Sequence, residues 1–192
     1  MERRTFLMSA AATAALSAAP TFTLAAAAKK KEIALGPLLA PWTGPHGGIP
    51  PFEKVKIADF KPAFSTSMDL LRDEIRNITG SNAAPTFDNT VVPFEDAGRP
   101  FGRVQNFFGI YTSAMNDKTM QKIEADMSPV LAAFTDEIIQ NEALFARLKA
   151  VYDARKKAGL NDEQQRLTDV HYTRFARRGA ALSTDQKTRL KE

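Results

Sequence analysis

Apolar residues recur at steps of three and four positions along most of the chain after Asp59. Such spacing places them on one face of a helix, and no segment alternates apolar and polar residues as a half-buried strand does. The connections between the stripes span about two to six residues, which favours antiparallel neighbours. The pattern therefore predicts an all-α body of antiparallel helical hairpins. Its apolar stripes are Phe64, Met68, Leu71, Ile75 and Ile78; Phe94, Ala97, Phe101, Val104, Phe108 and Tyr111; Met120, Ile123, Met127, Leu131, Phe134 and Ile138; Leu144, Phe145, Leu148, Val151 and Tyr152; and Leu167, Val170, His171 and Phe175.

Capping residues indicate where these helices begin. A Ser, Thr, Asp or Asn side chain accepts a hydrogen bond from the first turn, and a Glu or Gln three residues later can return one. Asn161 with Gln164, and Ser183 with Gln186, follow that spacing. The other predicted starts are Thr86 or Asp88, Asn116-Asp117 and Asn141.

Proline and glycine indicate where helices end or bend. Gly80 follows the first stripe, and Pro93 and Pro100 interrupt the second, so we expect either a kink or two helices in sequence there. Pro129 lies inside the third stripe, where it removes one backbone donor and should bend the helix.

The residues before the helical body have a different composition. Five prolines and four glycines between residues 33 and 55 exclude regular structure, because the prolines remove backbone donors and the glycines permit tight turns. The same stretch contains Leu38, Leu39, Trp42, Ile49 and Phe52, which are too apolar for a free linker. We expect residues 29–58 to form an extended Pro/Gly-rich arm on a helical body formed by residues 59–192, with Trp42 docked in a groove.

Residues 1–28 have the layout of an export signal, with basic residues, then an apolar run, then a small-residue tail. Arg3, Arg4, Phe6 and Leu7 stand where a twin-arginine signal has them, and Lys29-Lys30-Lys31 fits that route. An ordinary secretory leader is the alternative, and either one predicts a periplasmic protein. The apolar run is too short to span a bilayer, so no permanent membrane anchor is expected.

Composition narrows the class of partner. The chain has 192 residues, 26 of them Lys or Arg and 22 Asp or Glu, which gives a net charge of +4. Because the two signs are mixed along the helices, no basic stripe forms and nucleic-acid binding is not expected. There is no cysteine, so disulfides, thiolate metal sites and a Cys nucleophile are excluded.

Candidate metal ligands are few. The chain has two histidines, His46 and His171, 125 positions apart, and neither has the second His four residues away that a helical zinc pair requires. His171 lies on the apolar face of its helix, between Leu167 and Phe175. We interpret it as a core or interface histidine with one hydrogen-bonded nitrogen; the alternative is an imidazole that lines a cleft.

The carboxylate pairs do not indicate catalysis either. Adjacent residues in a helix diverge by about 100°, so neither Glu95-Asp96 nor Asp73-Glu74 predicts an acid–base couple, and we expect both pairs on solvated faces. No G-x-S-x-G motif is present, so a serine triad is not predicted. From the residues alone we therefore predict no catalytic and no metal-binding residue in this chain.

Several segments, taken in order, resemble the start of the peptidyl-dipeptidases (dipeptidyl carboxypeptidases), in the zinc metallopeptidase family that includes oligopeptidase A and thimet oligopeptidase. None is a catalytic motif; the resemblance lies in their order along nearly the whole chain after the leader. The segments are PLLAPWTGPHGGIPPFEKVKIADFKPAF at 37–64, APTFDNT at 84–90, FEDAGRPFGRV at 94–104, EADMSPVLAAF at 124–134, NEALFAR at 141–147 and FARRGAAL at 175–182.

The resemblance implies a large helical enzyme of two lobes around a channel that admits short peptides. It also implies one Zn²⁺, held by a His-Glu-x-x-His segment and a downstream Glu, in a C-terminal catalytic region that has no counterpart here. Residues 59–192 would then be the N-terminal helical part of an exported peptidase, truncated at its C-terminal end and inactive alone. The alternative is a self-standing periplasmic helical binding or scaffold protein.

Overall fold

The computed structural model describes residues 36–45, 48–182, 186 and 189. Apart from one bridge between Thr43 and Ile49, the regular structure of these residues is helical, which confirms the all-α prediction. The predicted leader, His46 and the proposed cap at Ser183 lie outside the described residues. The helices are α1 (Phe60–Thr79), α2 (Val92–Asp96), α3 (Arg99–Ala114), α4 (Lys118–Ile139), α5 (Glu142–Ala154) and α6 (Asp162–Arg177), with a π-helical turn at Phe87–Val91 before α2.

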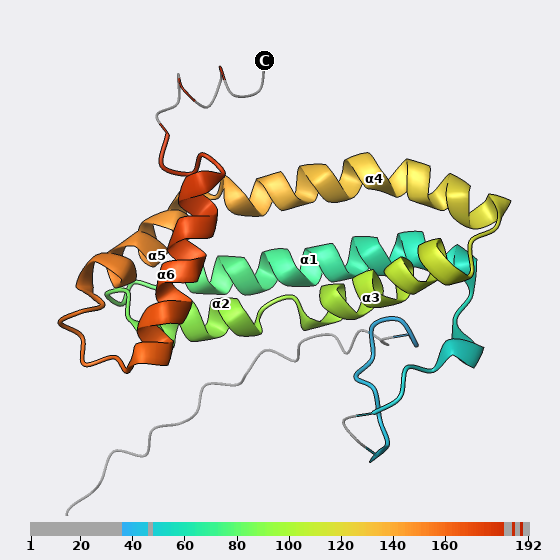
Figure 1. The fold of residues 1–192 in the computed structure, drawn as a ribbon, viewed down its shortest axis with the longest axis horizontal. Helices are drawn as coiled ribbons and strands as arrows, with labels where there is room; N and C mark the ends of the chain where they lie inside the picture. Colours follow the sequence, from blue (N-terminus) through green and yellow to red (C-terminus); the bar gives the residue numbers. More distant parts are fainter. Residues whose placement is uncertain (1–35, 46–47, 183–185, 187–188, 190–192) are drawn as a thin grey trace, which may run out of the picture. The chain divides into compact units, whose positions relative to one another are not determined.

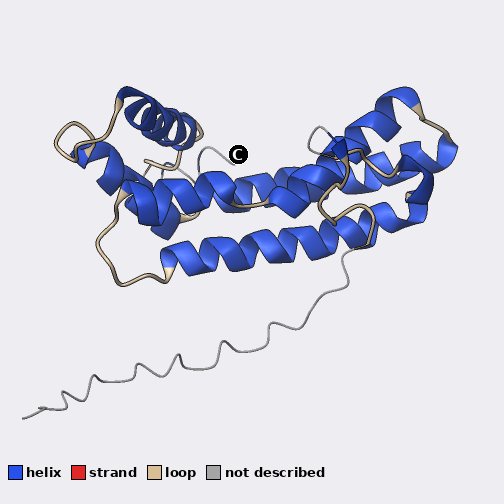
Figure 2. Ribbon diagram, turned by 90° about the horizontal axis from the view of Figure 1, so that it is seen from below, coloured by secondary structure: helices blue, strands red, loops and turns tan. Residues whose placement is uncertain are grey.

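The helices bury two adjoining apolar clusters. Helices α1, α3 and α4 lie along one another around the first, and α5 and α6 pack together around the second at one end of α4 (Figures 1 and 2). Phe64 and Met120 are fully buried in the first cluster, and Leu144 and Phe175 in the second. No helix in the described part of the chain is both long and apolar enough to cross a membrane.

The caps predicted from the sequence start the helices. Asn161 Oδ1 accepts from the Gln164 N–H at 2.9 Å while Gln164 Oε1 accepts from the Asn161 N–H at 3.0 Å, so the predicted capping box is confirmed. Of the two candidates before the π-helical turn, Thr86 is the cap, and it forms a second box with Asn89. Asp117 and Asn141 cap α4 and α5 through a single side-chain bond each, accepting from the N–H groups of Met120 and Leu144.

The prolines of the second stripe separate two helices. Pro100 lies in the first turn of α3, just after the break, where a missing N–H costs nothing; Pro93 lies in α2, which continues directly from the π-helical turn. Between them Ala97 adopts extended backbone angles and Gly98 has φ = +76°, so the helix is interrupted between α2 and α3. Pro129, by contrast, lies within α4, which the structure assigns as one helix from Lys118 to Ile139.

The arm packs on the first cluster. Leu38 and Leu39 are buried, and the Trp42 ring meets Phe107 edge-on at 5.9 Å between centroids. Arg103 Nε and Nη2 both donate to the Leu39 carbonyl, at 2.9 and 2.7 Å, and so bind the backbone of the arm to α3. Short 3₁₀ turns at Phe52–Lys54 and Ile57–Asp59 then lead into α1.

Candidate functional site

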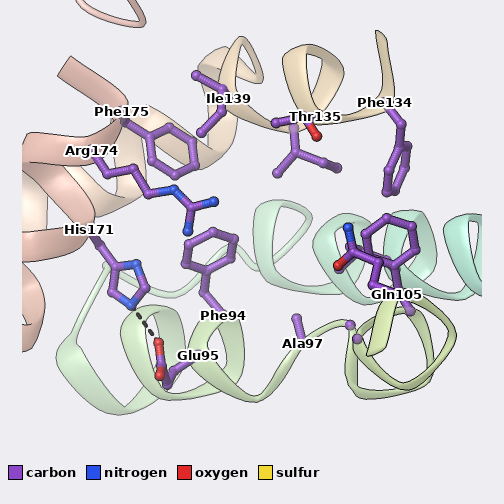
Figure 3. Close-up of a pocket in the computed structure, with 15 residues that line it drawn as sticks. Phe94, Glu95, Ala97, Gln105, Phe134, Thr135, Ile139, His171, Arg174 and Phe175 are labelled. Atoms are coloured by element: carbon purple, nitrogen blue, oxygen red, sulfur yellow. Dashed lines mark hydrogen bonds and ion pairs between the residues drawn. The ribbon is translucent and has the colours of Figure 1, made fainter. Parts of the chain in front are cut away.

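A cavity of about 290 Å³ opens where the break between α2 and α3 faces α1, α4 and α6. Its walls contain four phenylalanine rings, so we call it the phenylalanine cavity. The rings form two edge-to-face pairs, Phe94 with Phe175 at 5.6 Å and Phe101 with Phe134 at 5.1 Å between centroids. These rings come from four helices, and the Gly98 break is what leaves α2 and α3 on either side of the opening (Figure 3).

One wall carries a histidine–carboxylate pair. His171 Nε2, on α6, lies 2.8 Å from Glu95 Oε2, on α2, and the His171 ring also packs edge-on against Phe94 at 5.1 Å (Figure 3). His171 is 7% exposed, whereas the Glu95 side chain is 56% exposed. Burial lowers the pKa of His171, and the hydrogen bond to Glu95 opposes that shift only in part. The imidazole is therefore neutral near pH 7, with its proton on the nitrogen that faces Glu95.

The other ring nitrogen of His171 has no partner. With Nε2 donating to the carboxylate, Nδ1 is an acceptor, and it is shielded from solvent with no donor among the described residues. A buried acceptor without a donor costs free energy, since water no longer solvates it. This nitrogen is the most unusual polar feature of the wall.

Arg174 lies one turn after His171, on the rim of the same cavity. Its side chain is exposed and, within the described residues, makes no hydrogen bond or ion pair. Its charge is close enough to lower the pKa of His171 further. Thr135, also on the rim, already donates to the Leu131 carbonyl at 2.9 Å. Among the described lining residues, the uncommitted donors are therefore those of Arg174 and of the Gln105 amide.

His171 is buried with one nitrogen hydrogen-bonded, as the first interpretation predicted, and it also lines the cavity, as the alternative predicted. Glu95 lies on a solvated face as expected, with its side chain 56% exposed, and its carboxylate in addition binds His171, which the sequence did not predict. Its neighbour Asp96 instead pairs with Arg99, at the start of α3. The reason is the divergence of adjacent helical positions, which directs one carboxylate toward α6 and the other along the chain surface.

Glu74 corrects the expectation for the other acidic pair. Its Oε2 accepts from the Gly98 N–H at 2.7 Å and so holds the break beside the cavity, while Asp73 pairs with Arg76 on the surface of α1. Val170 is also displaced from its predicted place, being 43% exposed, because the buried face of α6 runs through Thr168, His171 and Phe175. No local sequence signal reveals these partners.

The described residues do not fit the zinc ion that the family resemblance implies. No three His, Asp or Glu side chains in this part of the chain gather closely enough to hold a metal. His171 Nε2 and Glu95 Oε2 are already hydrogen-bonded to each other. A tetrahedral zinc site would need further ligands, and the described residues place none beside this pair.

Comparison with known proteins gives relatives among peptidases, although no family model matches the sequence. The chain is 39% identical to dipeptidyl carboxypeptidase of Salmonella typhimurium over 142 residues, and 33% identical to that of Escherichia coli over 151. It is 22% identical to oligopeptidase A of Escherichia coli over 156 residues. These matches cover 74%, 79% and 81% of the chain.

The chain spans about a fifth of these relatives: the matches cover 21%, 21% and 22% of their lengths. The resemblance predicted from the sequence is confirmed by them. The chain is homologous to part of the dipeptidyl carboxypeptidases and, more distantly, to part of oligopeptidase A.

Proposed function

We propose that this chain, as a homologue of part of the dipeptidyl carboxypeptidases, supplies a helical section of an exported zinc metallopeptidase that hydrolyses short peptides. The observation that carries the proposal is the 39% identity that extends over 74% of the chain yet covers only 21% of the relative. A match of that extent indicates that a whole section of the enzyme is shared, rather than an isolated motif.

The proposal assigns this section a structural and binding role. Its described residues form packed helices with one aromatic-walled cavity and supply no metal-binding cluster. When bound in the complete enzyme, the zinc ion would polarise the scissile carbonyl and activate water. We place that ion and its ligands in the rest of the enzyme, so the 192-residue chain should not hydrolyse peptides by itself.

A chimaera tests this proposal. The 142 matching residues would replace their counterparts in the Salmonella typhimurium dipeptidyl carboxypeptidase, and release of dipeptides from a short peptide would be measured with and without a chelator. We expect a chelator-sensitive active chimaera, no activity from this chain alone, and no activity from the relative lacking the section. Hydrolysis by the pure chain would overturn the proposal. A folded but inactive chimaera would favour the alternative of a self-standing helical binding or scaffold protein.

Export is part of the proposal and needs its own test. Residues 1–31 would be fused to a folded reporter, and its periplasmic fraction would be measured for the native segment and for the Arg3→Lys, Arg4→Lys double variant. The twin-arginine route is addressed by the Arg-Arg pair, so we expect the double variant, which lacks both, to leave the reporter in the cytoplasm. Lys30→Gln is the matched control, outside the twin-arginine pair. Equal export of native and double-variant fusions would indicate an ordinary secretory leader.

A further inference from the structure

Two tyrosines form the closest ring stack among the described residues. Tyr152 of α5 and Tyr172 of α6 lie 3.9 Å apart between ring centroids, with 14° between their planes. We propose that this pair is a site of oxidative modification, at which a one-electron oxidant couples the two phenols into a dityrosine cross-link between α5 and α6. The inference stands on this stack and is independent of the proposed function.

Neighbouring groups hold the two rings together before an oxidant arrives. The Arg155 guanidinium lies over the Tyr152 ring, 3.6 Å from its centroid, and Arg155 Nη1 donates to the Tyr152 carbonyl at 2.6 Å. Phe145 lies nearly parallel to Tyr172, 5.8 Å away between centroids. One face of Tyr152 is therefore covered by a cation and the other by an aromatic ring, and both contacts are attractive.

The hydroxyl edges of the two rings remain accessible. Both tyrosines are half-buried, and neither hydroxyl is hydrogen-bonded in the part of the chain that the structure describes or shielded from solvent. The pKa of Lys149 is raised chiefly by its ion pair with Asp153 and also by Tyr172, which places the Tyr172 oxygen near an exposed ammonium. A soluble oxidant can therefore reach the phenols.

The third tyrosine of the chain has neither feature. Tyr111 is 5% exposed, and its nearest aromatic contact is the Phe60 ring, edge-on at 5.2 Å. The chain has no cysteine, so no thiol of its own competes for the oxidant or reduces a tyrosyl radical. Coupling within one chain is therefore expected at Tyr152 and Tyr172.

The coupling removes one electron and one proton from each phenol. The unpaired electron of a tyrosyl radical is shared between the oxygen and the ring carbons ortho to it. Because the stacked rings are in van der Waals contact, a small tilt about the side-chain bonds brings two ortho carbons together, and they form a carbon–carbon bond. Each ortho hydrogen then moves to its phenol oxygen as the ring becomes aromatic again. The product has lost two hydrogens, and one hydrogen peroxide accepts those two electrons and two protons to give two waters.

The test treats the 192-residue chain, at micromolar concentration, with a haem peroxidase and an equimolar amount of hydrogen peroxide. We expect dityrosine fluorescence in a monomer that has lost two hydrogens, and peptide mapping should join the segments that contain Tyr152 and Tyr172. Within the folded chain the rings meet at an effective concentration in the millimolar range, about a thousandfold above that of a second chain, so monomer product should exceed dimer at least about tenfold. Chain unfolded in urea, where only loop closure brings the rings together, should give less.

Three phenylalanine variants separate the stack from general oxidation. Tyr152→Phe and Tyr172→Phe keep a ring in the stack and remove one phenol, so each should lower the monomer product at least about tenfold. Tyr111→Phe is the matched control and should change it less than about twofold, because a buried phenol without a tyrosine neighbour takes no part. The cross-linked monomer should also unfold at a higher urea concentration, since the link closes a loop of about 20 residues in the unfolded chain.

Dimers without a cross-linked monomer, or a yield no higher in the folded than in the unfolded chain, would overturn the inference. So would a product that persists in Tyr152→Phe or Tyr172→Phe, or one that Tyr111→Phe lowers as much as they do. Mapping of the native product identifies the joined residues even if a variant fails to fold. Peptide hydrolysis by the chimaera is unaffected by any of these outcomes, so the proposed function is tested separately.

Discussion

Replacing Gly98 by Ala adds one methyl group at the break between α2 and α3, where the backbone has φ = +76°. An L-residue in this left-handed region costs roughly 1–2 kcal/mol, because its Cβ crowds the following carbonyl. The Cβ would also lie 3.2 Å from Leu71 Cδ2, a flexible atom that can shift slightly. Ala also has fewer conformations than Gly in the unfolded chain, which raises the free energy of unfolding by about 0.4–1 kcal/mol. We therefore expect the free energy of unfolding to fall by about 1 kcal/mol.

The same chemical change elsewhere in the second stripe should have the opposite sign. Gly109 lies inside α3, is exposed, and has no atom within 4 Å of the position that a Cβ would take. Ala at this position should stabilise the protein by roughly 0.5–1 kcal/mol, since Gly is a poor helix former. The Gly109→Ala variant is thus the matched control for Gly98→Ala.

Urea denaturation followed by circular dichroism measures both variants. The unfolding midpoints should move in opposite directions from that of the native chain, with unchanged slopes, and the melting temperature of Gly98→Ala should fall by roughly 2–4 °C. If Gly98→Ala were as stabilising as Gly109→Ala, α2 and α3 would be continuous in solution. The break, and the opening of the phenylalanine cavity that depends on it, would then be refuted.

Three further changes test other parts of the fold. Arg147→Met should lower the free energy of unfolding by about 2 kcal/mol, because the buried guanidinium holds two backbone carbonyls and an amide oxygen; Arg166→Met, on an exposed arginine, should change it little in the same urea assay. Asn161→Ala should lower it by about 1 kcal/mol through loss of the α6 cap, and an unchanged urea midpoint would contradict the capping box. The folded-state pKa of His171 is below its ordinary 6.5, so the unfolded chain binds more protons and the free energy of unfolding should fall as pH drops through and below 6.5. His171→Gln should lose that component between pH 7.5 and 5.5, and a variant with the native pH dependence would contradict the assignment.

The helix boundaries could be predicted from the sequence because their causes are local. The Asn161–Gln164 box acts over three residues, and Pro100 blocks the helix within the turn that contains it. The apolar stripes also predicted which helix faces are buried, because the spacing of apolar residues is local too. Val170 is the exception, since the buried positions of α6 include the polar Thr168 and His171. The hydroxyl of Thr168 is satisfied by the Gln164 carbonyl at 2.8 Å, so a polar residue could take the inward position.

The cavity could not be predicted, because its parts come from four helices and meet only when those helices pack. Phe101 and Phe134 lie in different apolar stripes, each of which indicates core but not a gap between them. The gap depends on a single backbone conformation at Gly98, whose N–H is held by Glu74, 24 residues earlier. Neither the glycine nor the glutamate has a sequence neighbour that signals this contact.

The two acidic pairs have partners that their sequence did not predict. Adjacent helical residues point about 100° apart, and from this we excluded Glu95-Asp96 and Asp73-Glu74 as catalytic couples. The same divergence lets one member reach a neighbouring helix or turn while the other stays on the surface: Glu95 binds His171 and Glu74 binds Gly98, whereas Asp96 and Asp73 pair within the chain surface. A carboxylate that is unsuited to acid–base chemistry with its neighbour is therefore still free to build a site with a residue 76 positions away. In this chain, Glu95 and Glu74 both serve the phenylalanine cavity, one by positioning its histidine and the other by holding the break beside it.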